Sequence, residues 1–259
     1  ISTGSGTVGI GGNIGGTTST DLAAIKINES AGSGAITLSG NIGTTSVFGA
    51  TTIEIGNADT TSLSLDGSFY SSDDAQTYKA DAYSLGGTDP DFASTGDNII
   101  FHDGGTTTAF VLGNAADLEV NTNLGASAGG NIEFKDNITI KGIQNNAAQD
   151  VVLDAGTGTV TVKAIGTSTA EINDVTITGT GGIFLRGDIT TMAHTVSSSE
   201  DTGDVTISSA AEINAASVTI DTSDGTGGSV DFDSTINSTT SNGALTITSK
   251  GGAVAIDGV

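Results

Sequence analysis

The fold is decided by the stretch Val151-Val-Leu-Asp-Ala-Gly-Thr-Gly-Thr-Val-Thr-Val162, followed by Val175-Thr-Ile-Thr-Gly179. Apolar residues recur at spacing two within each run, and glycines separate the runs. Residues two apart lie on one face of a strand, so each run predicts a short strand with one buried face. The apolar pairs are Ile36/Leu38, Ile53/Ile55, Leu63/Leu65, Ile132/Phe134, Val151/Leu153, Val160/Val162, Val175/Ile177, Ile183/Leu185, Val205/Ile207, Val218/Ile220, Val230/Phe232, Leu245/Ile247 and Val254/Ile256.

The spacing of these strands predicts a β-solenoid. Every second strand recurs after about 24 residues, as from Val151 to Val175 and from Val205 to Val230. If one coil takes that interval and coils stack at ~4.8 Å, residues 1–259 make a single rod of about eleven coils, roughly 50 Å long. Val, Ile and Leu would then stack in columns through its narrow interior. The expected fold class is all-β, a parallel β-helix without long helices.

Composition disfavours two alternatives to the solenoid. Disorder is disfavoured because the 36% of hydrophobic residues fall into ordered alternating runs. An antiparallel β-sandwich also has short strands at regular spacing, and Asn242-Gly243 is a hairpin-type dipeptide. A sandwich of this length would need two domains and more large aromatics than three tyrosines and eight phenylalanines. The solenoid is therefore the preferred prediction.

The charge excludes several classes of partner. The chain has 30 acidic residues against seven basic ones, a net charge of −23. Nucleic acids and anionic membrane surfaces would be repelled, and the basic residues are too scattered to form a phosphate-binding patch. No apolar run approaches the ~20 residues of a membrane span, so no membrane insertion is expected. Without cysteine, stability must come from strand pairing and core stacking. No signal peptide is recognisable, so the chain is expected to be a mature or internal piece of a longer protein.

The segment 66–103 differs from the rest in composition. It contains all three tyrosines, the only proline and a cluster of aspartates, so we expect an irregular aromatic and acidic loop that leaves the rod laterally. Its aromatic residues are the candidate ligand-binding residues, and its carboxylates are the candidate ligands for calcium, a hard cation that prefers oxygen. No cofactor is required. The ligand-binding candidates are Tyr70, Tyr78, Tyr83 and Phe92, and the calcium candidates are Asp73, Asp74, Asp89 and Asp91.

Several stretches resemble a known family. Gly130-Asn-Ile-Glu-Phe134, Val151–Val162, Gly203-Asp-Val-Thr-Ile207 and the tripeptide Gln76-Thr-Tyr78 are similar to the β-strand repeats of giant bacterial surface exoproteins, the filamentous-haemagglutinin-like adhesins. The resemblance implies a right-handed parallel β-helix in a secreted or cell-surface fibre used for adhesion or matrix building. We recognise no secretion-domain signature, no translocator barrel and no Gly-Gly-x-Gly-x-Asp nonapeptide array of the kind that binds calcium in type-I-secreted toxins and adhesins. The resemblance therefore leaves the export route and this mode of calcium binding open.

No motif predicts catalysis. Acid pairs such as Asp231/Asp233 could serve glycoside hydrolysis, but so many acids produce pairs by chance. His102 and His194 are the only histidines, and without cysteine they cannot build a zinc site. No Gly-x-Ser-x-Gly motif accompanies them. Arg186 is the only arginine, which argues against lyase chemistry. The chain is therefore not expected to be an enzyme.

The expected function is a structural or adhesive shaft of an extracellular fibre. Val8-Gly-Ile10 and Val254-Ala-Ile256 look like ordinary coil strands, so neither end of the rod looks capped. The expected partners are neighbouring copies of this chain or further repeats of it, which add turns to the shaft, together with surface glycans. The alternative is a carbohydrate-binding or polysaccharide-cleaving β-helix that uses the aromatic segment.

Overall fold

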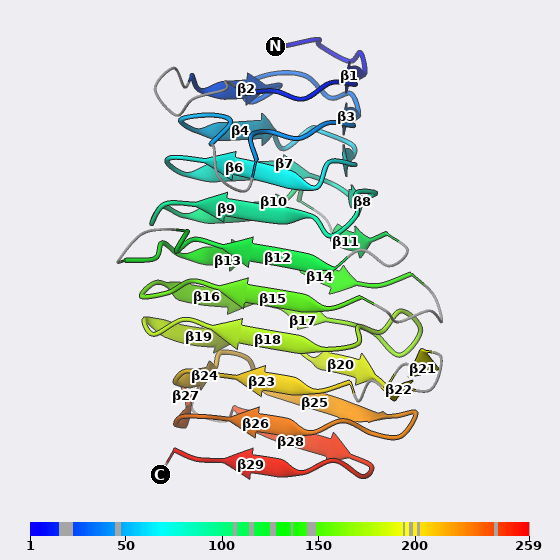
Figure 1. Cartoon of the computed structure of the whole chain (residues 1–259), viewed down its shortest axis with the longest axis vertical. Helices are drawn as coiled ribbons and strands as arrows, with labels where there is room; N and C mark the ends of the chain where they lie inside the picture. Colours follow the sequence, from blue (N-terminus) through cyan, green and yellow to red (C-terminus); the bar gives the residue numbers. More distant parts are fainter. Residues whose placement is uncertain are drawn as a thin grey trace.

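The chain winds into a parallel β-solenoid in a computed structural model that describes residues 1–15, 23–44, 48–105, 108–113, 117–124, 128–135, 137–143, 149–193, 195–196, 199–200, 203–240 and 243–258. Figure 1 shows the turns stacked along the long axis, with the N-terminus at one end and the C-terminus at the other. The predicted fold class is confirmed. None of the described residues belongs to a helix, so none forms a helix that could span a membrane.

Three sheets run along the rod, and each full turn adds one strand to each of them in the order A, B, C. All pairings between neighbouring strands of these sheets are parallel. A short antiparallel hairpin, β21 (Thr195–Val196) and β22 (Ser199–Glu200), lies outside them. The dipeptide Asn242-Gly243 was the sequence signal for an antiparallel hairpin, and its Asn242 falls outside the described residues.

The strands are as follows. Sheet A contains β1 (Val8–Ile10), β3 (Ile36–Leu38), β5 (Leu63–Leu65), β8 (Tyr83–Leu85), β11 (Thr108–Leu112), β14 (Ile138–Lys141), β17 (Ala164–Ile165), β20 (Ile189–Met192), β25 (Ser217–Asp224) and β28 (Ala244–Ser249). Sheet B contains β6 (Phe69–Ser72), β9 (Asp91–Ser94), β12 (Leu118–Asn121), β15 (Val151–Asp154), β18 (Val175–Thr178), β23 (Val205–Ile207), β26 (Val230–Phe232) and β29 (Val254–Ile256). Sheet C contains β2 (Ile25–Ile27), β4 (Ile53–Gly56), β7 (Gln76–Ala80), β10 (Ile99–Asp103), β13 (Ile132–Phe134), β16 (Thr159–Val162), β19 (Gly182–Leu185), β24 (Ala211–Ile213) and β27 (Ile236–Ser238).

The number of turns differs from the prediction. Sheet B, the shortest, holds eight strands, so the rod has about eight full turns instead of eleven. Two further N-terminal turns carry isolated bridges at Ile14 and Ile42 where a strand of sheet B would stand. The prediction of eleven coils assumed a constant length of 24 residues. The length in fact varies, since Ser64 and Ser84 are equivalent after 20 residues whereas Asp117 and Asp150 are equivalent after 33.

The segment 66–103 is not a lateral loop, so that prediction is wrong. It contains five strands, β6 to β10, which pair in register with the turns on either side. The segment is regular because its aromatic residues occupy inward positions that Ile, Leu and Val fill in other turns. Phe101, for example, is the register partner of Tyr78. The unusual composition therefore marks an aromatic section of the core and not a departure from the coil.

The aromatic core is built by stacking across turns. Each sheet contributes a column of rings, because register partners on adjacent strands both point inward and lie directly above one another along the rod axis. In sheet C the centroids of Tyr78 and Phe101 lie 5.1 Å apart, and those of Phe101 and Phe134 lie 4.8 Å apart. Tyr70 stacks on Phe92 at 4.9 Å in sheet B. Such offset stacks stabilise beyond the burial of area alone.

The tripeptide Gln76-Thr-Tyr78 has a structural role inside this core. The Gln76 side-chain amide is fully buried and donates to the carbonyl oxygens of Tyr70 and Ala93 at 2.8 and 2.7 Å. Its Oε1 accepts a hydrogen bond from the Tyr78 hydroxyl at 2.8 Å. A buried polar group is tolerated when its hydrogen bonds are made, and here they tie two turns of sheet B together from within.

Candidate functional site

The predicted aromatic ligand-binding residues form part of the core. Tyr70, Tyr78, Tyr83 and Phe92 are each exposed by 1% or less. Burial raises the pKa of all three tyrosine hydroxyls, which therefore stay neutral. The prediction of an exposed aromatic binding platform is wrong, because alternation places these side chains on the inner faces of β6, β7, β8 and β9.

The predicted calcium ligands are not gathered in one place. Asp73 and Asp74 follow β6, whereas Asp89 and Asp91 lie at the start of β9. Asp91 stands beside Phe69, so Asp73 lies four residues further along the sheet, roughly 13 Å away. Within the described part of the chain, these carboxylates form no group with metal-ligand spacing. The prediction grouped these four residues because it took segment 66–103 to be one loop, whereas they belong to neighbouring parallel strands.

Asp91 is nevertheless unusual among the acids. It lies next to Glu119 on the adjoining strand, and its Oδ1 is buried without a hydrogen-bond partner. Burial, followed by the negative charge of Glu119, raises the pKa of Asp91 to about 6. Its environment therefore disfavours the ionised form that a cation ligand needs.

A different group of carboxylates does converge near the C-terminal end of the rod. Asp231, Asp233 and Asp257 place carboxylate oxygens within 4.8 Å of one another. The Asp257 N–H donates to the carbonyl oxygen of Phe232 at 2.8 Å, which sets Asp257 beside Asp233. Burial, followed by the charges of Asp233 and Asp257, raises the pKa of Asp231. The sequence signal was present, because Asp257 follows the Asp231/Asp233 pair by one period of the repeat.

A second set of acids, which we call the aspartate ladder, runs along the corner before sheet B. In each step, a carboxylate Oδ1 accepts the backbone N–H of the equivalent residue one turn later, at distances from 2.6 to 3.4 Å. The N–H groups stabilise the carboxylates, while like charges at the ~5 Å turn spacing repel one another. The ladder consists of Asp89, Asp117, Asp150, Asp174 and Asp204, and Ser229 donates the last N–H.

This repulsion predicts a dependence of stability on salt. Raising sodium chloride shortens the screening length from ~30 Å at 0.01 M to ~3 Å at 1 M, so the melting temperature should rise. Each ~1 kcal/mol of relieved repulsion should raise it by roughly 2–4 °C in a chain of this size.

Calcium at matched ionic strength tests the acidic group near the C-terminal end. If the three carboxylates bind calcium, the ion should raise the melting temperature beyond the effect of ionic strength. Asp257→Asn should abolish this additional rise, and the distant Glu212→Gln should keep it. Differential scanning fluorimetry measures both effects. A midpoint indifferent to both salts would contradict the prediction.

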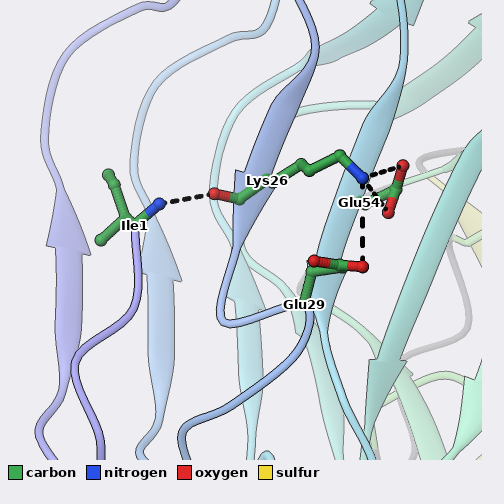
Figure 2. Close-up of polar contacts among 4 residues, drawn as sticks. All are labelled: Ile1, Lys26, Glu29 and Glu54. Carbon is green, nitrogen blue, oxygen red and sulfur yellow. Dashed lines mark hydrogen bonds and ion pairs between the residues drawn. The ribbon is translucent and has the colours of Figure 1, made fainter.

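At the N-terminal end, charged side chains surround a cavity of about 310 Å³ on the outer face of sheet C. Figure 2 shows Lys26 reaching Glu54 and Glu29, with Nζ–Oε distances of 2.8 and 3.9 Å. The hydrogen bond to Glu54 is the main cause that raises the pKa of Lys26. The Ile1 ammonium donates to the Lys26 carbonyl oxygen at 2.7 Å, so residue 1 covers part of the edge of β2. Exposed ion pairs of this kind contribute little stability.

The same cavity contains one of the two histidines. His102 on β10 lines it together with Lys79, its neighbour on β7, and with Glu54. Groups of both charges line the cavity, and its described lining includes no serine that could complete a Ser-His-Asp triad. His194 lies outside the described residues. The absence of enzymatic activity stays a prediction.

The distinctive features are therefore a fully stacked core, an aspartate ladder, an acidic group near one end and a mixed-charge cavity near the other. None of them is a complete catalytic constellation. Comparison of this chain with protein families, with curated proteins and with solved structures finds no match in any of the three.

Proposed function

We propose that the chain is a structural and adhesive shaft segment of an extracellular or cell-surface fibre, in which further turns cover the ends of the rod. The supporting observation is the exposure of core columns in the last turn. Val254 and Ile256 are 50% and 48% exposed, whereas their register partners Val230 and Phe232 are fully buried. Val230 and Phe232 have β29 beside them, whereas β29 is the last strand of its sheet. Burying such apolar area is favourable, so these columns accept another turn.

The edges of the sheets support the same proposal. At the C-terminal end β28, β29 and β27 are edge strands, and β1 and β2 are edge strands at the other end. An edge strand presents backbone N–H and C=O groups that pair readily with another strand. The added turn belongs either to the same polypeptide or to a second copy stacked head to tail, an arrangement that does not close on itself.

The extracellular location is part of this proposal. A chain that lacks cysteine and carries a net charge of −23 stays soluble as a long fibre and relies on repeated strand pairing for its stability. The repeats that resemble those of bacterial surface exoproteins favour the same location. The aromatic residues that were predicted to bind carbohydrate are buried in the core, so they do not support the alternative of a carbohydrate-binding protein.

Self-association of the purified chain tests the proposal. We expect sedimentation velocity to detect concentration-dependent association, and electron microscopy to detect thin unbranched rods. The double substitution Val254→Lys with Ile256→Lys should weaken association at least about tenfold, because it places charges on the open core columns. Ala255→Lys is the matched control, since residue 255 lies between them on the opposite face of β29.

Two outcomes would count against end-to-end stacking. One is a monomer at all concentrations from micromolar to millimolar. The other is equal weakening by Ala255→Lys, which would indicate a lateral contact through the outer face of sheet B.

A further inference from the structure

A groove runs along the outer face of sheet A, away from the open ends. Three cavities of about 290, 480 and 290 Å³ adjoin one another there. The first two share Ser168 and Thr190, and the last two share Thr139 and Thr167. Together they cross β11, β14, β17, β20 and β25, which corresponds to roughly 19 Å along the rod axis.

The groove is hollow because its floor is made of small residues. Ala164 is the register partner of Thr139, and Gly166 lies beside Thr190, so small residues form the centre of the floor. Gly166 has a positive φ of 72°, and a Cβ there would lie 1.9 Å from the Thr190 carbonyl oxygen. From Gly166 the chain turns outward and comes back beside β20, where Ile172 bridges to Thr191. This turn forms one wall.

Most of the residues that line the groove have polar side chains, and its exposed surface is most polar at the end near Glu171. Hydroxyl groups lie along its whole length, and Ala109 and Ala164 are its only apolar residues among those described. Lys141 and Lys163 lie toward one end, and carboxylates gather at the other. Hydroxyls donate and accept, as the hydroxyls of a sugar do. The hydroxyl residues with exposed surface in the groove are Thr139, Thr167, Ser168, Thr190 and Ser223, whereas Thr108 and Thr191 are fully buried and the Thr191 hydroxyl donates to the Gly203 carbonyl oxygen.

The acidic end contains a buried carboxyl group that faces the cavity. Glu171 is only 5% exposed, and its side chain shares a hydrogen bond with Asp224, with Asp221 close by. Two carboxyl groups can share such a bond only if one of them carries a proton. Burial, then the charge and hydrogen bond of Asp224, then the charge of Asp221 raise the pKa of Glu171 to about 6.

We propose that this groove binds an extended glycan chain that bears amino groups, with an ammonium group of the sugar taking the place of the proton between Glu171 and Asp224. The hydroxyl-lined middle of the groove binds the sugar hydroxyls. The net charge of −23 disfavours a polyanionic glycan. An extended peptide is disfavoured because sheet A has no free edge in the groove with which its backbone could pair.

The spacing of the acids favours an ammonium group over a metal ion. Within the described residues, Glu171, Asp221 and Asp224 are not among the groups whose ligand atoms all lie within 4.8 Å of one another. A calcium ion would gather all three carboxylates into one shell at ~2.3–2.6 Å, whereas an ammonium group needs only two of them, as acceptors of charge-assisted N–H···O bonds of ~2.7–2.9 Å. The inference does not depend on the proposed shaft function, because the groove lies on the side of the rod.

Calorimetric titration of the intact chain at pH 6 tests this inference with two probes, a glucosamine hexamer and its fully N-acetylated counterpart. We expect the amino form to bind at least about tenfold more tightly. Titration in two buffers of different ionisation enthalpy should detect proton release on binding. Glu171→Gln should lose both the preference and the proton release, while Glu212→Gln on the outer face of sheet C makes the same charge change and should leave them intact.

Circular dichroism establishes that Glu171→Gln still folds, and the isosteric Thr190→Val provides a second variant, which should weaken both hexamers. Equal affinity for the two hexamers would overturn the role of the acid pair, and absence of binding up to millimolar concentration would overturn the groove itself. Equally tight binding of a hexalysine peptide would replace the glycan by a cationic peptide. None of these outcomes bears on self-association through the ends of the rod.

Discussion

Phe101→Ala is expected to lower the free energy of unfolding by about 3–5 kcal/mol. The Phe101 ring is fully buried at the centre of the aromatic core. It stacks on Tyr78 and Phe134 above and below, and it meets the edges of Phe92 and Phe110 at 5.2 and 5.0 Å. Removing the ring leaves a cavity that three sheets border and that paired strands cannot close. Urea unfolding followed by circular dichroism measures the change.

Phe184→Ala is the control for this prediction. Phe184 lies on β19 of the same sheet, but it is half-buried on the outer face, between Thr161 and Glu212 of the neighbouring strands. We expect its loss to change stability by less than about 1 kcal/mol. Equal losses for the two variants would mean that the stacked interior does not dominate the stability of the rod.

Asp150→Ala is expected to destabilise the chain by about 2–4 kcal/mol, because each buried donor left without an acceptor costs about 1–3 kcal/mol. Asp150 Oδ1 accepts two hydrogen bonds of 3.0 Å, from the backbone N–H of Asp174 and from the side-chain amide of Asn173. Asn173 is 2% exposed, so water cannot easily replace Asp150 as the acceptor for its side-chain amide.

Asp150→Asn separates hydrogen bonding from charge. Asparagine keeps the Oδ1 acceptor and removes one negative charge between Asp117 and Asp174 in the ladder. We therefore expect stability within about 1 kcal/mol of the unmodified chain, with a weaker dependence on sodium chloride. If Asn destabilised as much as Ala, the negative charge and not the acceptor geometry would be what the corner requires.

The candidate sites were less predictable than the fold. Asp231 and Asp233 stood out as an acid pair, but their meeting with Asp257 depends on the register between β26 and β29. Glu171 carried no sequence signal, because its environment comes from a turn that folds back beside β20 and from the end of β25. Such sites join residues from different turns, and spacing along the chain determines them only when every intervening turn has a known length.

The sequence by itself determined the parallel coil and the inward face of its strands. Side chains alternate with period two in any strand, so pairs such as Val151/Leu153 identify the buried positions directly. Only the tertiary structure decided the number of turns, the burial of Tyr70 and Tyr78, and the grouping of the acids. Those features depend on the number of residues in each corner before the next strand begins. Backbone hydrogen bonds between turns set this number, and no local sequence pattern encodes it.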